Sequence, residues 1–297
     1  MAATLTDERF DDPDWIFERK LDGIRCLAYR DSRGVRLVSR NNLSLDGRFP
    51  DVARALAAQG GGPLLLDGEV VAFAGSRTSF ARLADRRRRG RVPVFLYAFD
   101  VLFAGGRDVT GLPLLERKAV LRGALRPGGP LRLTPYRRRE GRRLYAEACR
   151  RGWEGLIAKR ADSTYVQARS RDWLKWKCES QQELVVGGWT EPKGSRAGLG
   201  ALLVGHWEDG RLRYAGKVGT GFDRETLLEL AGRLRELQRA ESPFADAGRV
   251  RASWAEPRLV AQVAFTEWTR DGRLRHPRFL GLREDKDPRD VVRERPS

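Results

Sequence analysis

A lysine close to the N-terminus is the first residue of this sequence that could act as a nucleophile. Lys20 ends a strand-like run over 15–20, and a second such run begins at Ile24. Asp22-Gly23 between the runs predicts a tight turn, because glycine tolerates positive φ and aspartate hydrogen-bonds its own backbone. We therefore expect a hairpin with Lys20 at the rim of a sheet, over a pocket. Apolar strands around it should lower the pKa of its amine, which favours a lysine nucleophile.

Charged and aromatic side chains recur inside later apolar segments. Strands are predicted over four of these: 64–73, 92–103, 153–160 and 173–177. Glu69 interrupts the first, and a carboxylate in a buried strand needs a partner or a function. In the last strand, Lys175 and Lys177 alternate with tryptophan and leucine, so both lysines project from one face. Glu69, Lys175 and Lys177 are therefore further candidates for catalysis or ligand binding.

The composition points to a polyanionic partner. The chain has 297 residues, enough for two domains, and its 57 Lys+Arg against 40 Asp+Glu give a net charge of +17. Most of the excess is arginine, which suits bidentate contacts with phosphate. Nucleic acid is the simplest such partner.

The cysteine and hydropathy patterns indicate in which compartment the protein is expected to work. The three cysteines, Cys26, Cys149 and Cys178, are odd in number and widely spaced, so we expect no disulfide framework and no zinc site. That usage is typical of a reducing cytoplasm. No apolar run is long enough to span a bilayer, and no signal-peptide core is present, so no membrane partner is expected.

The order of predicted elements indicates an α+β protein with two domains. Before a boundary near residue 180, the strands above and a further one over 34–40 alternate with helices over 49–59, 79–89, 114–125 and 140–151. The second of these helices ends in a basic run, Arg86–Arg89. Contact with DNA and a solvated surface remain equally open for it.

The segment after residue 180 predicts a small barrel. Strands are expected over 183–190, 200–207, 211–218 and 258–268, with Asp209-Gly210 closing a hairpin. A helix over 223–239 should begin at Asp223, a favourable N-cap. Several short strands with one helix in about a hundred residues fit an oligonucleotide-binding (OB) fold.

Six segments in order resemble the motifs of the covalent nucleotidyltransferases, which comprise ATP-dependent DNA ligases, RNA ligases and mRNA capping enzymes. They are Lys20–Arg25, Asp67–Glu69, Phe99–Leu102, Glu154–Lys159, Lys175–Lys177 and Leu282–Lys286. Within that superfamily the chain resembles the ligase domain of bacterial ligase D, which serves non-homologous end joining. This resemblance rests on Glu183–Trp189, Gly216–Phe222 and Arg275–Phe279. It implies antiparallel sheets with flanking helices in an adenylation domain over 1–180, followed by an OB-fold domain over 181–297.

The resemblance implies the reaction and a role for each motif residue. Lys20 would attack the α-phosphorus of ATP, and AMP would then pass to a 5′-phosphate before a 3′-hydroxyl seals the strand. Nucleotide binding is expected from Glu18 at the adenine amine, Phe99 as stacking face, and charged residues near ribose and phosphates: Arg25, Arg40, Glu69, Lys175 and Lys177. Lys175 and Lys177 should also repel a proton from Lys20.

The same resemblance implies the cofactors and partners. Glu69 and Glu154 are expected to bind Mg²⁺ or Mn²⁺ beside the phosphates. Arg283, Asp285 and Lys286 are expected to orient the leaving pyrophosphate, which would require the second domain to close over the nucleotide pocket. Nicked or broken duplex DNA would be the substrate, a Ku-type end-binding protein a possible partner, and a monomer at the bacterial nucleoid in the cytoplasm the expected state.

Two other functions share part of this pattern. An RNA ligase or a GTP-using capping enzyme shares the first motifs, but Arg283, Asp285 and Lys286 and the second domain favour DNA ligation. A basic nucleic-acid-binding module without catalysis would not need the intact set of lysines and glutamates.

Overall fold

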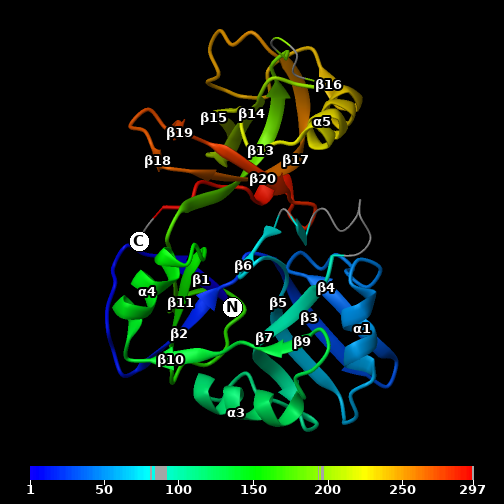
Figure 1. The fold of residues 1–297 in the computed structure, drawn as a ribbon, viewed down its shortest axis with the longest axis vertical. Coiled ribbons are helices and arrows are strands. Elements are labelled where there is room, and N and C mark those ends of the chain that lie inside the picture. The colour runs from blue at the N-terminus through cyan, green and yellow to red at the C-terminus, as the bar shows by residue number, and fades with distance from the viewer. Residues whose placement is uncertain (81, 84–91, 193, 195–196, 296–297) are drawn as a thin grey trace. The chain divides into compact units, whose positions relative to one another are not determined.

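The computed structural model describes residues 1–80, 82–83, 92–192, 194 and 197–295. Within it the chain divides into two compact units, Met1–Cys178 with Arg295–Ser297, and Glu179–Glu294. The Arg86–Arg89 run lies outside the described residues. Each unit has its own hydrophobic core. Figure 1 shows the helices and strands of each unit.

The described strands of the first unit form two sheets. One runs β1-β12-β11-β2-β10 and comprises β1 (Ala2–Leu5), β2 (Trp15–Lys20), β10 (Tyr136–Arg138), β11 (Gly155–Arg160) and β12 (Arg169–Lys177). The other has β3 (Ile24–Asp31), β4 (Gly34–Ser39), β5 (Leu64–Ala74) and β7 (Val94–Ala104) at its centre, with the short strands β6 (Arg77–Thr78), β8 (Arg107–Asp108) and β9 (Leu131–Leu133). Strand β1 was not anticipated, since its short segment carries no turn or periodicity signal.

The expected hairpin around Asp22-Gly23 does not form. Strand β2 belongs to the first sheet and β3 to the second, so the turn carries the chain from one sheet to the other. Gly23 is required there because a Cβ would lie 2.2 Å from the carbonyl oxygen of Val70. The side chain of Asp22 accepts a hydrogen bond from the Phe80 amide at 3.0 Å. The turn therefore joins the sheets, and Lys20 lies at the junction.

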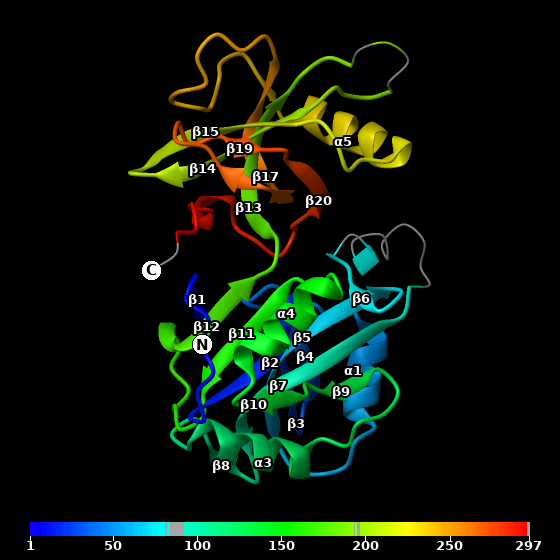
Figure 2. The same cartoon turned by 60° about the vertical axis from the view of Figure 1, so that its left-hand side comes forward.

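Helices cover the sheets where the predicted periodicity placed them. These are α1 (Pro50–Ala57), α3 (Leu114–Ala124) and α4 (Gly141–Arg150). Leu56 of α1 belongs to the core under the second sheet, and Ala148 of α4 packs with Trp176 against the first. Figure 2 shows α3 beside β10 at one edge of the unit. No helix among the described residues has the length and apolarity needed to cross a membrane.

A disulfide joins Cys149 of α4 to Cys178, so the prediction of no disulfide framework was wrong. The two residues are 29 positions apart in the sequence. They meet because α4 packs on β11 and β12, within the core that includes Ala148 and Trp176. The argument from cysteine usage to a reducing compartment therefore loses its premise. Cys26 is free and buried.

The second unit is a strongly bent antiparallel sheet closed by a helix. Its path β15-β14-β13-β17-β16 uses β13 (Ser180–Trp189), β14 (Leu202–Glu208), β15 (Arg211–Val218), β16 (Gln238–Arg239) and β17 (Ser253–Phe265), with β20 (Arg278–Leu282) on β17 and a separate pair β18 (Glu267–Trp268) and β19 (Leu274–Arg275). The predicted hairpin at Asp209-Gly210 is confirmed, with positive φ at both residues. Helix α5 (Arg224–Glu236) begins as predicted, because Asp223 accepts a hydrogen bond from the Thr226 amide at 2.8 Å. A 3₁₀ turn, Pro288–Asp290, follows.

Candidate active site

One face of the first sheet carries the basic motif residues of β2 and β12, which lie on either side of β11. Antiparallel pairing sets Lys20 opposite Gly155 and Gly155 opposite Lys177. In the next row, Ile157 lies between Glu18 and Lys175. Residues that face each other across antiparallel strands project from the same side of the sheet. The predicted nucleophile and both motif lysines of β12 therefore share one face.

Gly155 leaves the space between Lys20 and Lys177 open. Its φ is +150°, and a Cβ would lie 1.8 Å from the carbonyl oxygen of Trp176. Any other residue would therefore push β12 away from β11. The preceding Glu154 is held by the close approach of these strands, since its carbonyl accepts a hydrogen bond from the Cys178 amide at 2.9 Å.

The second sheet contributes its side chains from paired positions and from a bulge. Arg25 of β3 and Glu69 of β5 face each other, so they project together. Strand β7 pairs Asp100 with Asp67 and Ala98 with Gly68, leaving Phe99 as the extra residue of a β-bulge. Bulges redirect side chains, and here the bulge gives Phe99 its place in the pocket.

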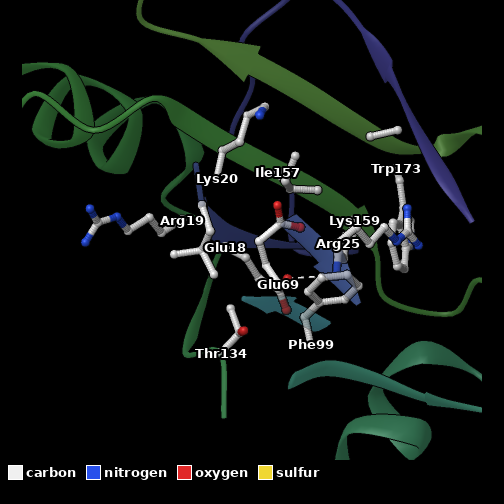
Figure 3. Close-up of a pocket in the computed structure, with 12 residues that line it drawn as sticks. Glu18, Arg19, Lys20, Arg25, Glu69, Phe99, Thr134, Ile157, Lys159 and Trp173 are labelled. Carbon is white, nitrogen blue, oxygen red and sulfur yellow. Dashed lines mark ion pairs between the residues drawn. The ribbon is translucent and has the colours of Figure 1, made fainter. Parts of the chain in front are cut away.

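A pocket between the two sheets gathers Lys20 and four of the seven residues predicted to bind the nucleotide. It is lined by Glu18, Lys20, Arg25, Glu69 and Phe99, together with Ile157, Lys159 and Trp173 (Figure 3). Lys175 and Lys177 lie on the same sheet face but outside this lining, and Arg40 is exposed beyond it. The predicted residues in the lining therefore form one site, whereas Lys175, Lys177 and Arg40 lie outside the lining.

The protonation of Lys20 differs from the sequence expectation. Burial lowers the pKa of its amine, but the neighbouring carboxylate of Glu154 outweighs that effect, so the pKa is raised. The Nζ atom lies 2.5 Å from Oε1 of Glu154. Glu69 and Asp22 act in the same direction. The prediction of a lowered pKa was wrong because it counted burial and lysine neighbours and omitted this carboxylate.

A second lysine of the pocket shows the opposite behaviour. Lys159 is buried, its pKa is lowered to about 8 mainly by burial, and its Nζ contacts Oε2 of Glu18 at 2.7 Å. Lys118 of α3 contacts the other oxygen of Glu18. Although burial opposes it, this pair of lysines lowers the pKa of Glu18. The ammonium of Lys159 also lies over the rings of Phe99 and Trp173, 4.3 and 3.8 Å from their centroids.

Arg25 is anchored by a carboxylate beneath it. It forms a bidentate pair with Asp67, with Nε–Oδ1 at 2.9 Å and Nη2–Oδ2 at 2.5 Å, and Tyr165 donates to the same carboxylate at 2.8 Å. Asp67 is fully buried and Arg25 partly exposed. The guanidinium is therefore fixed in direction at the mouth of the pocket while its outer edge can meet an anion.

Two carboxylates near Lys20 are candidates for a divalent cation. Oε2 of Glu154 is buried and accepts no hydrogen bond from any described residue. Glu69 lines the pocket together with Lys20, whose amine contacts the other oxygen of Glu154. Over the described part of the chain, no cluster of three or more carboxylate, cysteine or histidine ligands occurs. Two carboxylates with phosphate oxygens would fit magnesium, which keeps few protein ligands.

The last motif residues cluster at the end of β20 in the second unit. Arg283 forms a bidentate pair with Asp285, at 2.9 and 2.8 Å. Lys286 lies 3.2 Å from Oε1 of Glu183 on β13. All three predicted residues therefore belong to one charged group built on adjoining parts of the second unit.

Sequence reasoning missed Lys159, Trp173 and Lys118. The first two lie within or beside motif segments, but only sheet pairing shows that Lys159 and Trp173 are opposite each other. Lys118 carried no motif signal. Its position beside Arg117 in an amphipathic helix would have suggested a solvated basic pair, whereas both are buried.

Comparison with known proteins agrees with this geometry. The family model described as "ATP dependent DNA ligase domain" matches residues 2–177, and "ATP dependent DNA ligase C terminal region" matches residues 195–286. The multifunctional non-homologous end joining protein LigD of Pseudomonas aeruginosa is 40% identical over 96% of this chain, and the match spans 35% of that protein. The corresponding DNA repair protein of Mycobacterium tuberculosis is 39% identical over 94% of this chain and 37% of its own length.

A solved structure extends the likeness to three dimensions. Mycobacterial DNA ligase D complexed with ATP and MES superimposes with a TM-score of 0.69 at 34% identity, covering 99% of this chain and 98% of that one. The fold is therefore that of a nucleotidyltransferase domain with a C-terminal OB-fold domain. The chain belongs to the ATP-dependent DNA ligase family.

Proposed function

We propose that this chain seals 3′-hydroxyl/5′-phosphate breaks in duplex DNA through an AMP bound to Lys20. The observation that carries the proposal is the position of Lys20 at the junction of two sheets, in one pocket with Glu18, Phe99 and Glu69. The family match supports ATP as the AMP donor. Residues 1–180 would form the adenylation domain and 181–297 the OB-fold domain.

The base of ATP would enter between the two sheets. Phe99 of one sheet and Ile157 of the other offer apolar faces for stacking. The ionised carboxylate of Glu18 can only accept hydrogen bonds, which suits the exocyclic amine of adenine. Lys159 can donate to a ring nitrogen. Glu69 and Arg25 would then contact the ribose and α-phosphate, and Arg40 would meet the 5′-phosphate of the nick.

The first chemical step needs the neutral amine of Lys20. The ammonium must lose its proton, and the carboxylate of Glu154 is the nearest base at 2.5 Å. The amine then attacks the α-phosphorus, the bond to the bridging oxygen breaks, and pyrophosphate leaves. Lys175 and Lys177 would stabilise the developing negative charge from the neighbouring strand. In the later steps AMP passes to the 5′-phosphate, and the 3′-hydroxyl displaces it.

Mg²⁺ or Mn²⁺ fits the acidic side of this pocket. The unpartnered Oε2 of Glu154, with Glu69, would hold the ion. When bound, such an ion neutralises phosphate charge and polarises the phosphoryl oxygen. Its positive charge would also lower the pKa of Lys20 by competing for Glu154.

The charged group of the second unit would act in the first step. Arg283 and Lys286 can neutralise pyrophosphate as it leaves, and Asp285 fixes the guanidinium of Arg283. Replacing Arg283 and Lys286 with alanine should cripple transfer of AMP to the protein and spare sealing of a nick that already carries AMP. Equal loss in the two assays would refute a first-step role.

The relatives suggest the setting of the reaction. They are named for non-homologous end joining and DNA repair, so we infer that this chain repairs broken or nicked DNA at the bacterial nucleoid. A Ku-type protein that binds DNA ends would be its partner, and the chain would act as a monomer. In that cytoplasmic setting the Cys149–Cys178 pair would be open to reduction.

Intact-mass measurement after incubation with ATP or GTP tests the proposal. A shift by one AMP on wild-type protein with ATP, its absence in Lys20→Arg, and sealing of a nicked duplex are the expected results. Labelling by GTP alone would favour a capping enzyme. Labelling with sealing of RNA but not DNA would favour an RNA ligase, and no labelling at all would leave a binding module.

A further inference from the structure

Helix α3 presents two adjacent buried cations to the two sheets that form the pocket. Arg117 contacts Asp100 on β7, and Lys118 contacts Glu18 on β2. We propose that Arg117 and Lys118 are positioning residues that hold Phe99 and Glu18 as the two sides of a base-reading slot. The inference rests on the proposed function, because it explains how the adenine-binding groups of that site are fixed.

The Arg117 contact fixes the bulge from which Phe99 projects. Both side chains are fully buried, and the pair is bidentate, with Nε–Oδ1 and Nη2–Oδ2 each at 2.9 Å. Oδ1 of Asp100 also accepts from the Val101 amide at 2.9 Å. Nη1 of Arg117 donates to the carbonyls of Leu112 and Ser163. The backbone next to Phe99 is therefore tied to α3 and cannot relax into a regular strand without breaking this network.

The Lys118 contact fixes the direction and charge of Glu18. The carboxylate is held at one oxygen by Lys118 and at the other by Lys159, with all three side chains at most 4% exposed. A carboxylate between two ammonium groups stays ionised and has no freedom to rotate. It therefore remains an acceptor for the adenine amine, and it would repel the O6 acceptor of guanine at the same place.

One helix can reach both sheets because neighbouring helical residues point in different directions. Side chains at i and i+1 do not face each other, so Arg117 and Lys118 diverge from one turn of α3. Helix α3 contacts β7, and Figures 1 and 2 show it beside β10, which pairs with β2. The spacing between the stacking ring and the reading carboxylate is thus set by consecutive residues of one rigid element.

Substituting Lys118 and Arg117 one at a time tests the two sides of the slot separately. Lys118→Met should weaken ATP binding on the order of tenfold and reduce the preference for ATP over GTP by a similar factor, because Glu18 keeps only its Lys159 contact and can turn. Arg117→Lys should weaken ATP and GTP binding alike, since stacking on Phe99 does not distinguish the bases. Lys217→Met, on the exposed side of β15 in the other unit, is the control and should change neither.

A double variant shows whether Lys118 acts through Glu18. If it does, Glu18→Gln with Lys118→Met should bind ATP no more weakly than Glu18→Gln alone. Calorimetric Kd values for ATP and GTP provide the readout, and thermal unfolding identifies variants that fail to fold. A purely structural role would lower Tm without changing the ratio of the two Kd values.

The outcomes distinguish this inference from the proposed function. Absence of AMP on wild-type protein would refute the proposed function, while the binding data would still decide the slot. An unchanged ATP-to-GTP ratio in folded Lys118→Met, or additive losses in the double variant, would overturn the inference. Selective loss of ATP binding with a non-additive double variant would support it.

Discussion

Two lysine–glutamate groups at the first sheet affect their lysines in opposite ways. Lys20 contacts Glu154, and the pKa of the lysine is raised. Lys159 contacts Glu18, and the pKa of the lysine is lowered to about 8. Burial lowers the pKa of both amines, although the Lys20 side chain is 19% exposed and that of Lys159 only 2%, so burial alone does not explain a raised pKa for Lys20.

The number of cations per carboxylate explains it. Lys20 has Glu154 at 2.5 Å and is also favoured by Glu69 and Asp22. Lys159 must share Glu18 with Lys118, whose like charge adds to the effect of burial. In the first group, the carboxylates keep the amine of Lys20 protonated. The second holds the carboxylate of Glu18 rigid between two cations.

The largest expected contrast is between the two lysines as nucleophiles. Lys20→Arg should abolish AMP transfer to the protein, because arginine remains protonated and cannot attack phosphorus. Lys159→Arg should retain measurable transfer, since its role needs only a cation. Intact mass after incubation with ATP checks both variants. AMP on Lys20→Arg would identify another lysine as the nucleophile.

The next contrast is between the two glutamates. Glu154→Gln should slow AMP transfer on the order of a hundredfold, as expected for loss of an electrostatic group at the reacting centre. It should also move the pH–rate profile to lower pH, because the pKa of Lys20 falls once the carboxylate is gone. Rates across pH at saturating ATP measure this. The Glu18→Gln profile should stay in place, and equal displacement of both would contradict the comparison.

A disulfide lies next to the backbone of Glu154, in the group that contains Lys20. The backbone amide of Cys178 donates a hydrogen bond to the Glu154 carbonyl, and a disulfide joins Cys178 to Cys149, 29 positions earlier in the sequence. Reducing it should lower the free energy of unfolding by about 3.5 kcal/mol if loop closure dominates. Urea unfolding with and without reductant gives the value. Cys149→Ser is the control, and a reductant effect in that variant would show that the disulfide is not the cause.

The smallest effect is the pH dependence of stability due to Lys159. Its folded pKa lies below the ordinary value of 10.5, at about 8. Unfolding therefore takes up a proton between these values, and stability should rise with pH, by about 2 kcal/mol at about pH 9.5. Lys20 contributes with the opposite sign: its raised pKa gives stability that is fully present below 10.5 and is lost as pH rises from there through the folded value.

Urea midpoints of the wild type and Lys159→Met across pH 7 to about 9.5 isolate the Lys159 contribution. The difference between them should grow with pH in favour of the wild type. A difference that stays constant would show that Lys159 titrates normally.

The sequence by itself determined the local features of this protein. Its longer strands and its helices α1, α3, α4 and α5 follow from periodicity, the start of α5 at Asp223 from the capping rule, and the hairpin at Asp209-Gly210 from turn chemistry. Such signals depend on neighbours in the chain, which are visible in the sequence. The order of motif segments indicated the ligase family for the same reason.

Only the tertiary structure decided how charges and rings meet. Sheet pairing places Glu154 at Lys20 and reverses the expected direction of its pKa shift, and a bulge gives Phe99 its place in the pocket. The Cys149–Cys178 bond and the contact between Lys118 and Glu18 join residues far apart in the chain. These outcomes depend on distances between separate elements, because electrostatic and covalent contacts act through space and not along the sequence.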